Sequence, residues 1–407
     1  MITNPQPVFK VIESTQQNVE FQQQHHKSKI VIVANLPHFE PGFNCNTDDM
    51  VMINAKTDWE AVQSFLEQYS GTTLRSFLLE VERFSLWLCL VAKIPLSGLK
   101  RDSWFDYQTF LANAPESWRA IKQQRFNDDG SINPGWRPFA PEPLKPSSIN
   151  KSMKIIEALF AHLVEVKYLQ ASPVTKRRKK TGLQEQINNA TERYLSDDLL
   201  NSVSDQLLHL AQTEPVSRFD YIRANFIILL LRDTGLRISE AAKHTMGDIW
   251  VHDNGAWVLK IIGKGNKVRN IRIHKALKHA MMDYRQSIGL PPYPLLDEKT
   301  PLIPRRDKVS TITTRRIDQI LDWAFNLVAD SKAIDAGLTG SEVKRGKLLR
   351  DESILRKASA HWLRHSHATE YLKQTGSLKK TMDRLGHATV ATTMIYQHTE
   401  DLISEPD

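Results

Sequence analysis

The chain has 407 residues, 41% of them apolar, which is enough for two or three domains with cores of their own. Its formal net charge of +8 favours an anionic partner, nucleic acid first and an acidic membrane surface second. The two cysteines, Cys45 and Cys89, form no CxxC pair, so the sequence indicates neither a zinc site nor a disulfide framework. With no secretory signal pattern and no apolar run of about 18 residues, we expect a cytoplasmic protein without a membrane span.

Residues 1–55 show little periodicity. They are rich in glutamine and contain one strand-like run at 29–33. Neither a helix-turn-helix pattern nor a repeated basic pattern is visible. We therefore expect a partly ordered N-terminal extension, with a small additional DNA-binding unit as the alternative.

Residues 56–172 are predicted to form a small helical domain. Apolar residues recur at three- and four-residue spacing over 74–91, with Thr72 or Thr73 as the expected cap and Pro95 as the end of the run. The aromatic residues of this region are expected to belong to its core. Two further helices are expected at 104–112 and 148–166. The stretch between them, 113–146, is rich in proline and glycine and is expected to be a loop or an insertion.

A basic run follows a break at Pro173, and residues 173–190 are predicted to be an interdomain linker. Runs of cations are usually solvated surfaces. Between two domains of a basic protein, however, such a run favours contact with DNA phosphates. The predicted DNA-binding residues of the linker are Lys176, Arg177, Arg178, Lys179 and Lys180.

Residues 191–407 are predicted to form a larger domain of mixed α/β character. Ser196 is a candidate cap at the start of a helix. The run at 226–231 is apolar all round, which predicts a buried helix that ends at Thr234-Gly235. Residues 249–273 are expected to form a small antiparallel sheet with turns at Asp253-Asn254-Gly255 and Gly263–Lys267.

The rest of this domain is predicted to be helical, over 275–288 and 313–329. The charged stretch Ser331–Lys357 contains three glycines and is interpreted as an exposed excursion. The helix that carries His361 should end at Gly376. A short helix capped by Ser377 then runs to Leu385-Gly386, and residues 389–399 carry Tyr396.

The residues from His361 to Tyr396 indicate phosphoryl chemistry. A phenol is a poor nucleophile at its usual pKa of about 10, but it becomes useful when cations stabilise the group that it attacks. Two arginines can clamp the oxygens of a phosphodiester through forked hydrogen bonds. Arg364 lies one helical turn after His361, and Arg237 supplies the second guanidinium. Lys264, on a tight two-glycine turn, can reach over a bound backbone.

Four motifs occur in one order and spacing. They are Thr-Gly-Leu-Arg-Ile-Ser-Glu (234–240), Gly-Lys-Gly-Asn-Lys (263–267), His-Trp-Leu-Arg-His-Ser-His-Ala-Thr (361–369), and Leu-Gly-His (385–387) followed nine residues later by Tyr396. Together they resemble the tyrosine recombinase (phage integrase) family. The resemblance covers roughly residues 190–400. Residues 56–170 are similar only in helical character and position to the core-binding domain of that family.

The resemblance implies how each matching residue acts. Arg237 and Arg364 are expected to clamp the non-bridging oxygens of the scissile phosphate. Lys264 is expected to protonate the leaving 5′-oxygen, and Lys267 is a competing candidate for this proton donor. Lys267 is also expected to bind DNA.

The remaining matches concern the nucleophile and its surroundings. Tyr396 is expected to attack and form a 3′-phosphotyrosyl link. His361 would accept its proton or orient the phosphate, and His387 would donate a hydrogen bond to a phosphate oxygen. The link retains the phosphodiester energy, so no cofactor or metal is expected. The sequence agrees in having no GxxxxGK[ST] phosphate loop.

The resemblance also implies an architecture. The helical core-binding domain and the mixed α/β catalytic domain are expected to form a C-shaped clamp on duplex DNA at a specific recombination site. A homotetramer is expected in the synaptic complex, with a second recombinase or accessory factor left open. The function is integration, excision or resolution of DNA, and the sequence does not choose between them.

Several alternatives are open at this point. The His361–His365 pair has the i, i+4 spacing of a metal site, but no HExxH glutamate accompanies it. A type IB topoisomerase-like nicking and closing enzyme is one rival function, and a non-catalytic DNA-binding regulator on the same fold is another. The complete set of six candidates argues against the regulator, because a binder needs no nucleophile.

Overall fold

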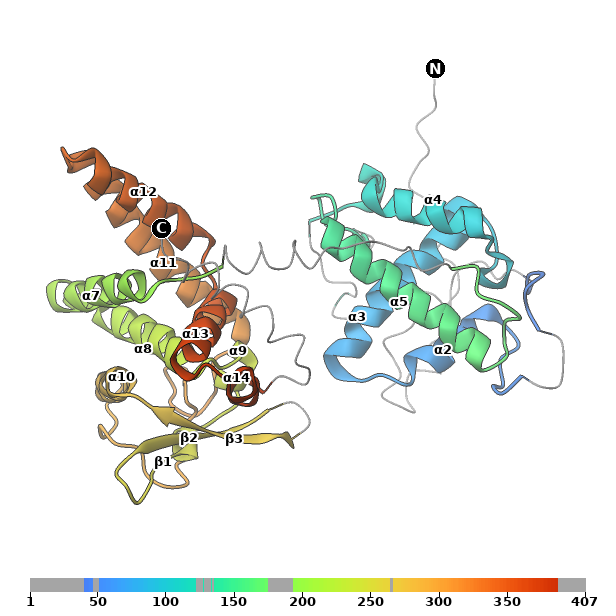
Figure 1. Cartoon of the computed structure of the whole chain (residues 1–407). Helices are drawn as coiled ribbons and strands as arrows, with labels where there is room; N and C mark the ends of the chain where they lie inside the picture. The colour runs from blue at the N-terminus through green and yellow to red at the C-terminus, as the bar shows by residue number, and fades with distance from the viewer. Residues whose placement is uncertain are drawn as a thin grey trace. The chain divides into compact units, whose positions relative to one another are not determined.

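The computed structural model describes residues 40–46, 51–121, 127, 133, 135–174, 193–263 and 266–386. The chain divides into two compact units, Met1–Lys179 and Lys180–Asp407, each with its own hydrophobic core (Figure 1). Both units are mostly helical, and the described residues hold a single three-stranded antiparallel sheet, in the second unit. The predicted fold class, mostly helical with a small antiparallel sheet, is confirmed. Within the described ranges, no helix is long and apolar enough to cross a membrane.

The described α-helices of the first unit are α2 (Asp58–Leu66), α3 (Gly71–Trp87), α4 (Arg101–Ala112) and α5 (Pro146–Glu165). The helix predicted over 74–91 is α3 together with a π-helix, Leu88–Ala92, that continues it. The cap expected at Thr72 or Thr73 is wrong. The helix begins earlier, at Gly71, and its N-cap residue Ser70 makes no side-chain capping bond.

The core of the first unit is aromatic, as expected. Phe84, Trp104, Tyr107 and Phe160 are buried, and the rings of Phe84 and Tyr107 meet edge to face with centroids 4.8 Å apart. The described part of the proline- and glycine-rich loop holds no α-helix, as predicted, and it packs on this core. Residues 40–46 and 51–55 also contribute side chains to the core surface, so it receives contacts from before residue 56. The buried side chains from the described part of the loop include those of Trp118 and Phe139.

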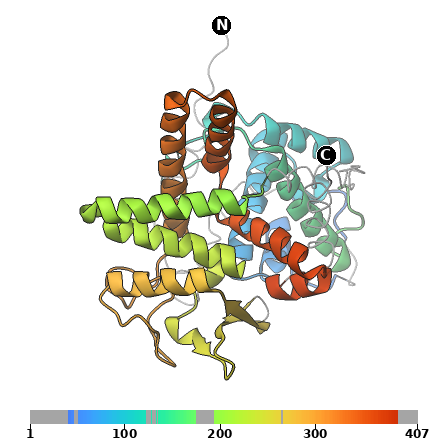
Figure 2. The same cartoon turned by 60° about the vertical axis from the view of Figure 1, so that its left-hand side comes forward.

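The first described helix of the second unit is α7 (Asp197–Thr213), which Ser196 caps as predicted by accepting a hydrogen bond from the Leu199 N–H. It continues with α8 (Arg218–Thr234), α9 (Ile238–Ala241) and α10 (Lys275–Ser287). The helix α8 lies between α7 and α10 in both Figure 1 and Figure 2, and its middle is buried all round. This confirms the buried helix predicted from the apolar run at 226–231.

The sheet has the order β1-β2-β3, formed by Ile249–Val251, Trp257–Ile262 and Val268–Ile273. Its register pairs Leu259 with both Ile249 and Ile271, and these three side chains face the core. The strand β3 alternates exposed and buried residues along its length, which is the pattern of a strand with one solvated face. The predicted sheet over 249–273 is confirmed.

The prediction for Ser331–Lys357 needs correction, because this stretch is helical. Most of it belongs to the end of α11 (Thr314–Leu338) and to α12 (Glu342–Lys357), two helices that pack side by side (Figure 1). A Cβ at Gly337 or Gly346 would meet no atom within 4 Å, so both glycines occupy exposed helical positions. Each costs about 1 kcal/mol relative to alanine, and packing outweighs that cost: Ala336 and Leu355 are buried.

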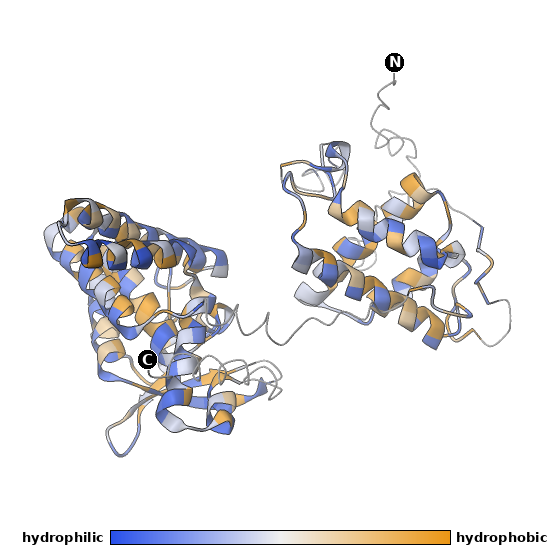
Figure 3. Cartoon of the chain, turned by 45° about the horizontal axis from the view of Figure 1, so that its top comes forward, coloured by the Kyte–Doolittle hydropathy of each residue, from blue (hydrophilic) through white to orange (hydrophobic). Residues whose placement is uncertain are grey.

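In Figure 3, polar residues dominate the outward surface of α11 and α12.

The last described helices are α13 (Ala360–Thr375) and α14 (Leu378–Leu385). They end at Gly376 and Gly386, both left-handed, and Ser377 caps α14, all as predicted. The strand-like run at 29–33, the linker cations and the segment 389–399 lie outside the described residues.

Candidate active site

The side chain of Arg364 lies between the C-terminal ends of α8 and α14 in the second unit. Arg364 is only 4% exposed. Its guanidinium donates to the carbonyl oxygen of Gly235 and, at 2.7 Å, to that of Leu385. Gly235 ends α8, and Leu385 is the last residue of α14. Helix ends carry carbonyl groups without an intrahelical partner, so a buried cation there both satisfies them and is held in a fixed orientation.

Arg237 lies two residues beyond Gly235, at the N-cap of α9. Its side chain is 41% exposed and its Nη1 donates to Glu240 Oε1 at 3.3 Å, while its backbone N–H donates to Glu240 Oε2 at 2.8 Å. The short turn after Gly235 therefore places Arg237 close to Arg364. One guanidinium is buried and fixed, and the other is accessible to a ligand.

Glu240 is the anion that holds this corner together. It accepts from Arg269 Nη1 at 3.1 Å and from Arg269 Nη2 at 2.8 Å. Burial alone would raise the pKa of Glu240, but the hydrogen bonds from Arg269 and from the Arg237 backbone outweigh it and hold the pKa below its usual value. Glu240 is therefore ionised near neutral pH, and its charge is shared with Arg269.

His244 links the same corner to the sheet. Its Nδ1 lies 2.9 Å from the Glu240 carbonyl oxygen, and its Nε2 accepts from the Ile262 N–H at 2.9 Å. This fixes the tautomer with the proton on Nδ1. Ile262 ends β2, immediately before the glycine turn, so His244 fixes the base of the turn that carries Lys264.

His361 lies in the first turn of α13, and its Nε2 lies 2.8 Å from His365 Nε2. Partial burial lowers the pKa of His361, and the charges of Arg193, Arg364 and Arg237 lower it further. A neutral imidazole beside several guanidinium groups can accept a proton, and the cations around it suit an anionic group such as a phosphate. Among the described residues, no group of three or more His, Cys, Asp and Glu side chains is placed to hold a metal ion.

The segment before α7 brings Arg193 to this site. The Leu195 N–H donates to Ser366 Oγ at 2.8 Å, and the Tyr194 hydroxyl donates to Glu370. Both acceptors belong to α13, the helix of His361 and Arg364. Ser366 and Glu370 thus attach the segment before α7 to the helix that carries the candidate site.

His367 has a structural role. It is buried, its Nδ1–H donates to the Arg232 carbonyl oxygen at 2.8 Å, and its Nε2 accepts from Arg384 Nε at 3.3 Å. Arg384 also donates to the Asp233 carbonyl oxygen at 3.0 Å. Together with Arg364, these two side chains satisfy the carbonyl groups at the C-terminal end of α8.

The structure thus brings together three of the six predicted site residues, Arg237, His361 and Arg364. Lys264, His387 and Tyr396 lie outside the described residues, as do the five cations of the linker, 176–180. Lys267 is described, half-exposed, with its Nζ 3.6 Å from Asp383 Oδ1.

Sequence reasoning missed Arg193 and Arg269. Arg269 left a signal, because it occupies an inward position on β3, in register with Ile271 and Ile273 on the buried face. A charged residue on the apolar face of a strand indicates a buried partner. Arg193 left no such signal, since only the path of the chain along α13 brings it near His361.

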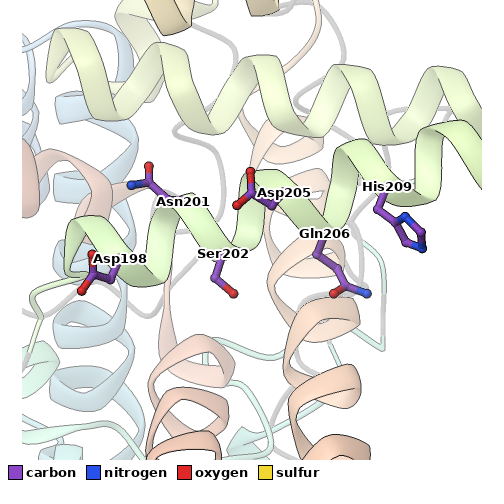
Figure 4. A pocket seen from close by; sticks show the side chains of 6 residues that line it. All are labelled: Asp198, Asn201, Ser202, Asp205, Gln206 and His209. Atoms are coloured by element: carbon purple, nitrogen blue, oxygen red, sulfur yellow. The ribbon is translucent and has the colours of Figure 1, made fainter.

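A shallow pocket on α7 is separate from these residues. Asp198, Asn201, Ser202, Asp205, Gln206 and His209 line it, all from α7 (Figure 4). Lys332 of α11 donates to Ser202 Oγ at 3.1 Å, so the pocket borders the contact between α7 and α11. None of the predicted site residues lines it.

Comparison with known proteins identifies the family to which the chain belongs. Residues 197–402, about half of the chain, match the model of the phage integrase family. This match places the chain in the class of integrase-type DNA recombinases. It belongs to the phage integrase family, the tyrosine recombinases, as its motifs indicated.

Individual relatives agree. The chain is 25% identical over 320 residues to the tyrosine recombinase XerD of Rickettsia conorii, a match that covers 76% of this chain and 90% of that protein. It is 24% identical over 354 residues to the tyrosine recombinase XerS of Streptococcus sanguinis, covering 81% and 87%. The fold is similar to that of the XerH site-specific recombinase bound to a palindromic difH substrate, with a TM-score of 0.55, 16% identity, and coverage of 91% of this chain and 90% of that one.

Proposed function

We propose that this protein is a site-specific recombinase that cleaves and rejoins duplex DNA through a 3′-phosphotyrosyl intermediate. The observation that supports this most is the junction of α8, α13 and α14, where Arg364, Arg237 and a neutral His361 come together. Membership of the tyrosine recombinase family supports the same reading. The proposal assigns this junction to the scissile phosphate.

In the proposed reaction, the Tyr396 Oη attacks the phosphorus atom and the bond from phosphorus to the 5′-oxygen breaks. His361 accepts the phenol proton, and Lys264 donates a proton to the leaving 5′-oxygen. Arg237, Arg364 and His387 donate hydrogen bonds to the non-bridging oxygens, which carry more charge in the transition state than in the substrate. Attack by a 5′-hydroxyl of a second duplex reverses each step and exchanges the strands.

The proposal extends to the DNA-binding surfaces. We assign DNA contact to both units, enclosing the duplex as a clamp, with 176–180 and Lys267 on its phosphates. Exchange between two duplexes then requires four active sites, and hence a tetramer. Integration, excision and resolution all use this chemistry.

The first test is covalent trapping with suicide duplexes, nicked near the cleavage position so that the cut end diffuses away. Duplexes that tile the DNA on both sides of the gene provide the candidate sites. Wild-type protein should form an adduct that survives denaturing electrophoresis, and Tyr396→Phe should bind the same duplex without forming one. Equal adducts from both proteins would place the nucleophile elsewhere.

Two other outcomes would favour the rival functions. Tight binding of one site with no wild-type adduct would favour a non-catalytic regulator. An adduct that forms without any complex of two duplexes, together with relaxation of supercoiled DNA, would favour a topoisomerase-like activity. Native electrophoresis of the trapped complex with a second, labelled duplex separates these readings.

A further inference from the structure

We propose that Arg269 is a positioning residue for the reaction, which fixes the Lys264 turn relative to Arg237. The inference rests on the proposed function, because it concerns the same site. Arg269 is on β3, and it matches none of the six candidates that the motifs supplied. Its importance comes from contacts between segments far apart in the sequence.

The first contact is the ion pair with Glu240. Arg269 uses Nη1 and Nη2 to donate to the two oxygens of that carboxylate, at 3.1 and 2.8 Å, and both side chains are less than 10% exposed. The same two oxygens accept from the side chain and the backbone N–H of Arg237. Arg269 and Arg237 are therefore held in one hydrogen-bonded unit with a shared anion.

The second contact is with the turn that carries Lys264. A Cβ built on Gly263 would lie 3.0 Å from Arg269 Nη1 and 3.4 Å from Glu240 Oε1. The backbone just before Lys264 therefore lies directly against the ion pair, and a side chain at position 263 would crowd the Arg269 guanidinium. The Gly263 N–H donates to the Lys267 carbonyl oxygen at 2.9 Å, which closes the turn above the pair.

The third contact is with the end of α14. A Cβ on Gly386 would lie 3.1 Å from Arg269 Nη1. Gly386 is left-handed, with φ of +63°, and it directly precedes His387. One guanidinium thus touches or bonds the segments that carry Arg237, Lys264 and His387.

Stability alone is a poor explanation for this arrangement. Apolar residues of similar volume often replace a buried ion pair with no loss of stability. In the described part of the chain, Arg269 Nε is buried without an acceptor, which costs free energy. A lysine would not reproduce the planar fork that meets two oxygens and two glycines at once. The geometry points to a requirement for a fixed turn.

The experiment uses the full chain and two forms of the suicide duplex that traps wild-type protein. One form has the natural 5′-oxygen at the scissile phosphate, and the other has sulfur at that bridging position. A thiolate leaves without a proton donor, so cleavage of the sulfur duplex does not depend on Lys264. The proteins are wild type, Lys264→Ala, Arg269→Met, Arg269→Lys and Arg285→Met, and the readout is the single-turnover rate of adduct formation at saturating DNA.

Arg269→Met should cleave the oxygen duplex at least about 100-fold more slowly than wild type, since a positioned general acid contributes about that much. On the sulfur duplex its rate should return to within about 10-fold of wild type, as for Lys264→Ala. Arg269→Lys should show a smaller loss with the same rescue by sulfur. The dissociation constant for DNA should change little in either variant.

Arg285→Met is the matched control. Arg285 is also buried and also pairs with a carboxylate, at 2.9 Å from Glu298, but it bonds none of the site segments. Its loss should lower the melting temperature without a difference between the two duplexes. Equal losses on both duplexes in the Arg269 variants, or no loss, would overturn the inference. Absence of any wild-type adduct would instead overturn the proposed function, and the inference with it.

Discussion

The three histidines of α13 show how differently one motif uses one residue type. His361 and His365 lie with their rings in edge contact near the solvent side of the candidate site, whereas His367 is buried between the end of α8 and Arg384. Burial, and after it the charge of Arg384, lowers the pKa of His367 to about 3. His367 is therefore neutral when folded and serves packing and helix-end hydrogen bonding, while His361 is available for proton transfer.

The depressed pKa of His367 predicts a stability change with pH. Between about pH 6.5 and pH 3 the unfolded chain protonates this histidine and the folded chain does not, so the free energy of unfolding falls as the pH is lowered. Replacing His367 by Asn should remove up to about 1.4 kcal/mol per pH unit of that slope. Urea unfolding at a series of pH values measures it.

The control for this prediction is His209→Asn, at an exposed position on α7. That variant should keep the wild-type slope. A slope in His367→Asn equal to that of wild type would show that other groups cause the acid sensitivity.

At the scale of elements, the site is built from helix ends. The helices α8, α13 and α14 each end at a left-handed glycine, Gly235, Gly376 and Gly386. The end of α8 accepts hydrogen bonds from Arg364, and so does the end of α14, where Gly386 also lies against Arg269. A Cβ at Gly376 would meet no atom within 4 Å. Helix ends expose carbonyl groups and permit close approach, which explains why the arginines gather there.

Gly235 and Gly376 provide a matched pair of variants. Alanine at either position adopts an unfavourable positive φ, which costs roughly 1–2 kcal/mol. At Gly235 the new Cβ would also lie 2.4 Å from His367 Cδ2, whereas at Gly376 it would meet nothing within 4 Å. Overpacking adds about 1–3 kcal/mol, so Gly235→Ala should be the more destabilising in urea unfolding and should also slow cleavage. Equal destabilisation would contradict the crowding at Gly235.

At the scale of the whole molecule, charge and the two separate cores matter most. The formal net charge of +8 includes the five consecutive cations at 176–180, near the division between the two units. Neutralising phosphates releases counterions, so DNA binding should weaken steeply with salt. The number of cations in contact with phosphate sets the slope.

The linker assignment can be tested through that slope. Replacing all five cations at 176–180 by glutamine should reduce the slope of log K against log salt by about 4.5 if each of them contacts one phosphate. The control replaces an equal number of exposed cations on α12, which changes the net charge identically: Lys344, Arg345, Lys347, Arg350 and Lys357. Equal changes in both variants would mean that net charge acts and the linker has no special contact.

The sequence by itself determined the family, most helix positions and the sheet, because those features depend on local patterns. Apolar spacing, the caps at Ser196 and Ser377 and the terminal glycines act within a few residues of each other. The one helical stretch that was misassigned, Ser331–Lys357, contains exposed glycines. Their local preference is outweighed by packing between α11 and α12, which no local pattern records.

The tertiary structure alone decided how the site is held. Arg364 bonds the ends of α8 and α14, Arg269 lies against Gly263 just before Lys264, and Arg193 approaches His361. All three arrangements depend on contacts between segments that are distant in the sequence. Such contacts follow from how buried polar groups find partners once the chain is compact. Residue types and spacing name the chemistry of a site, but only packing decides which buried charges orient it.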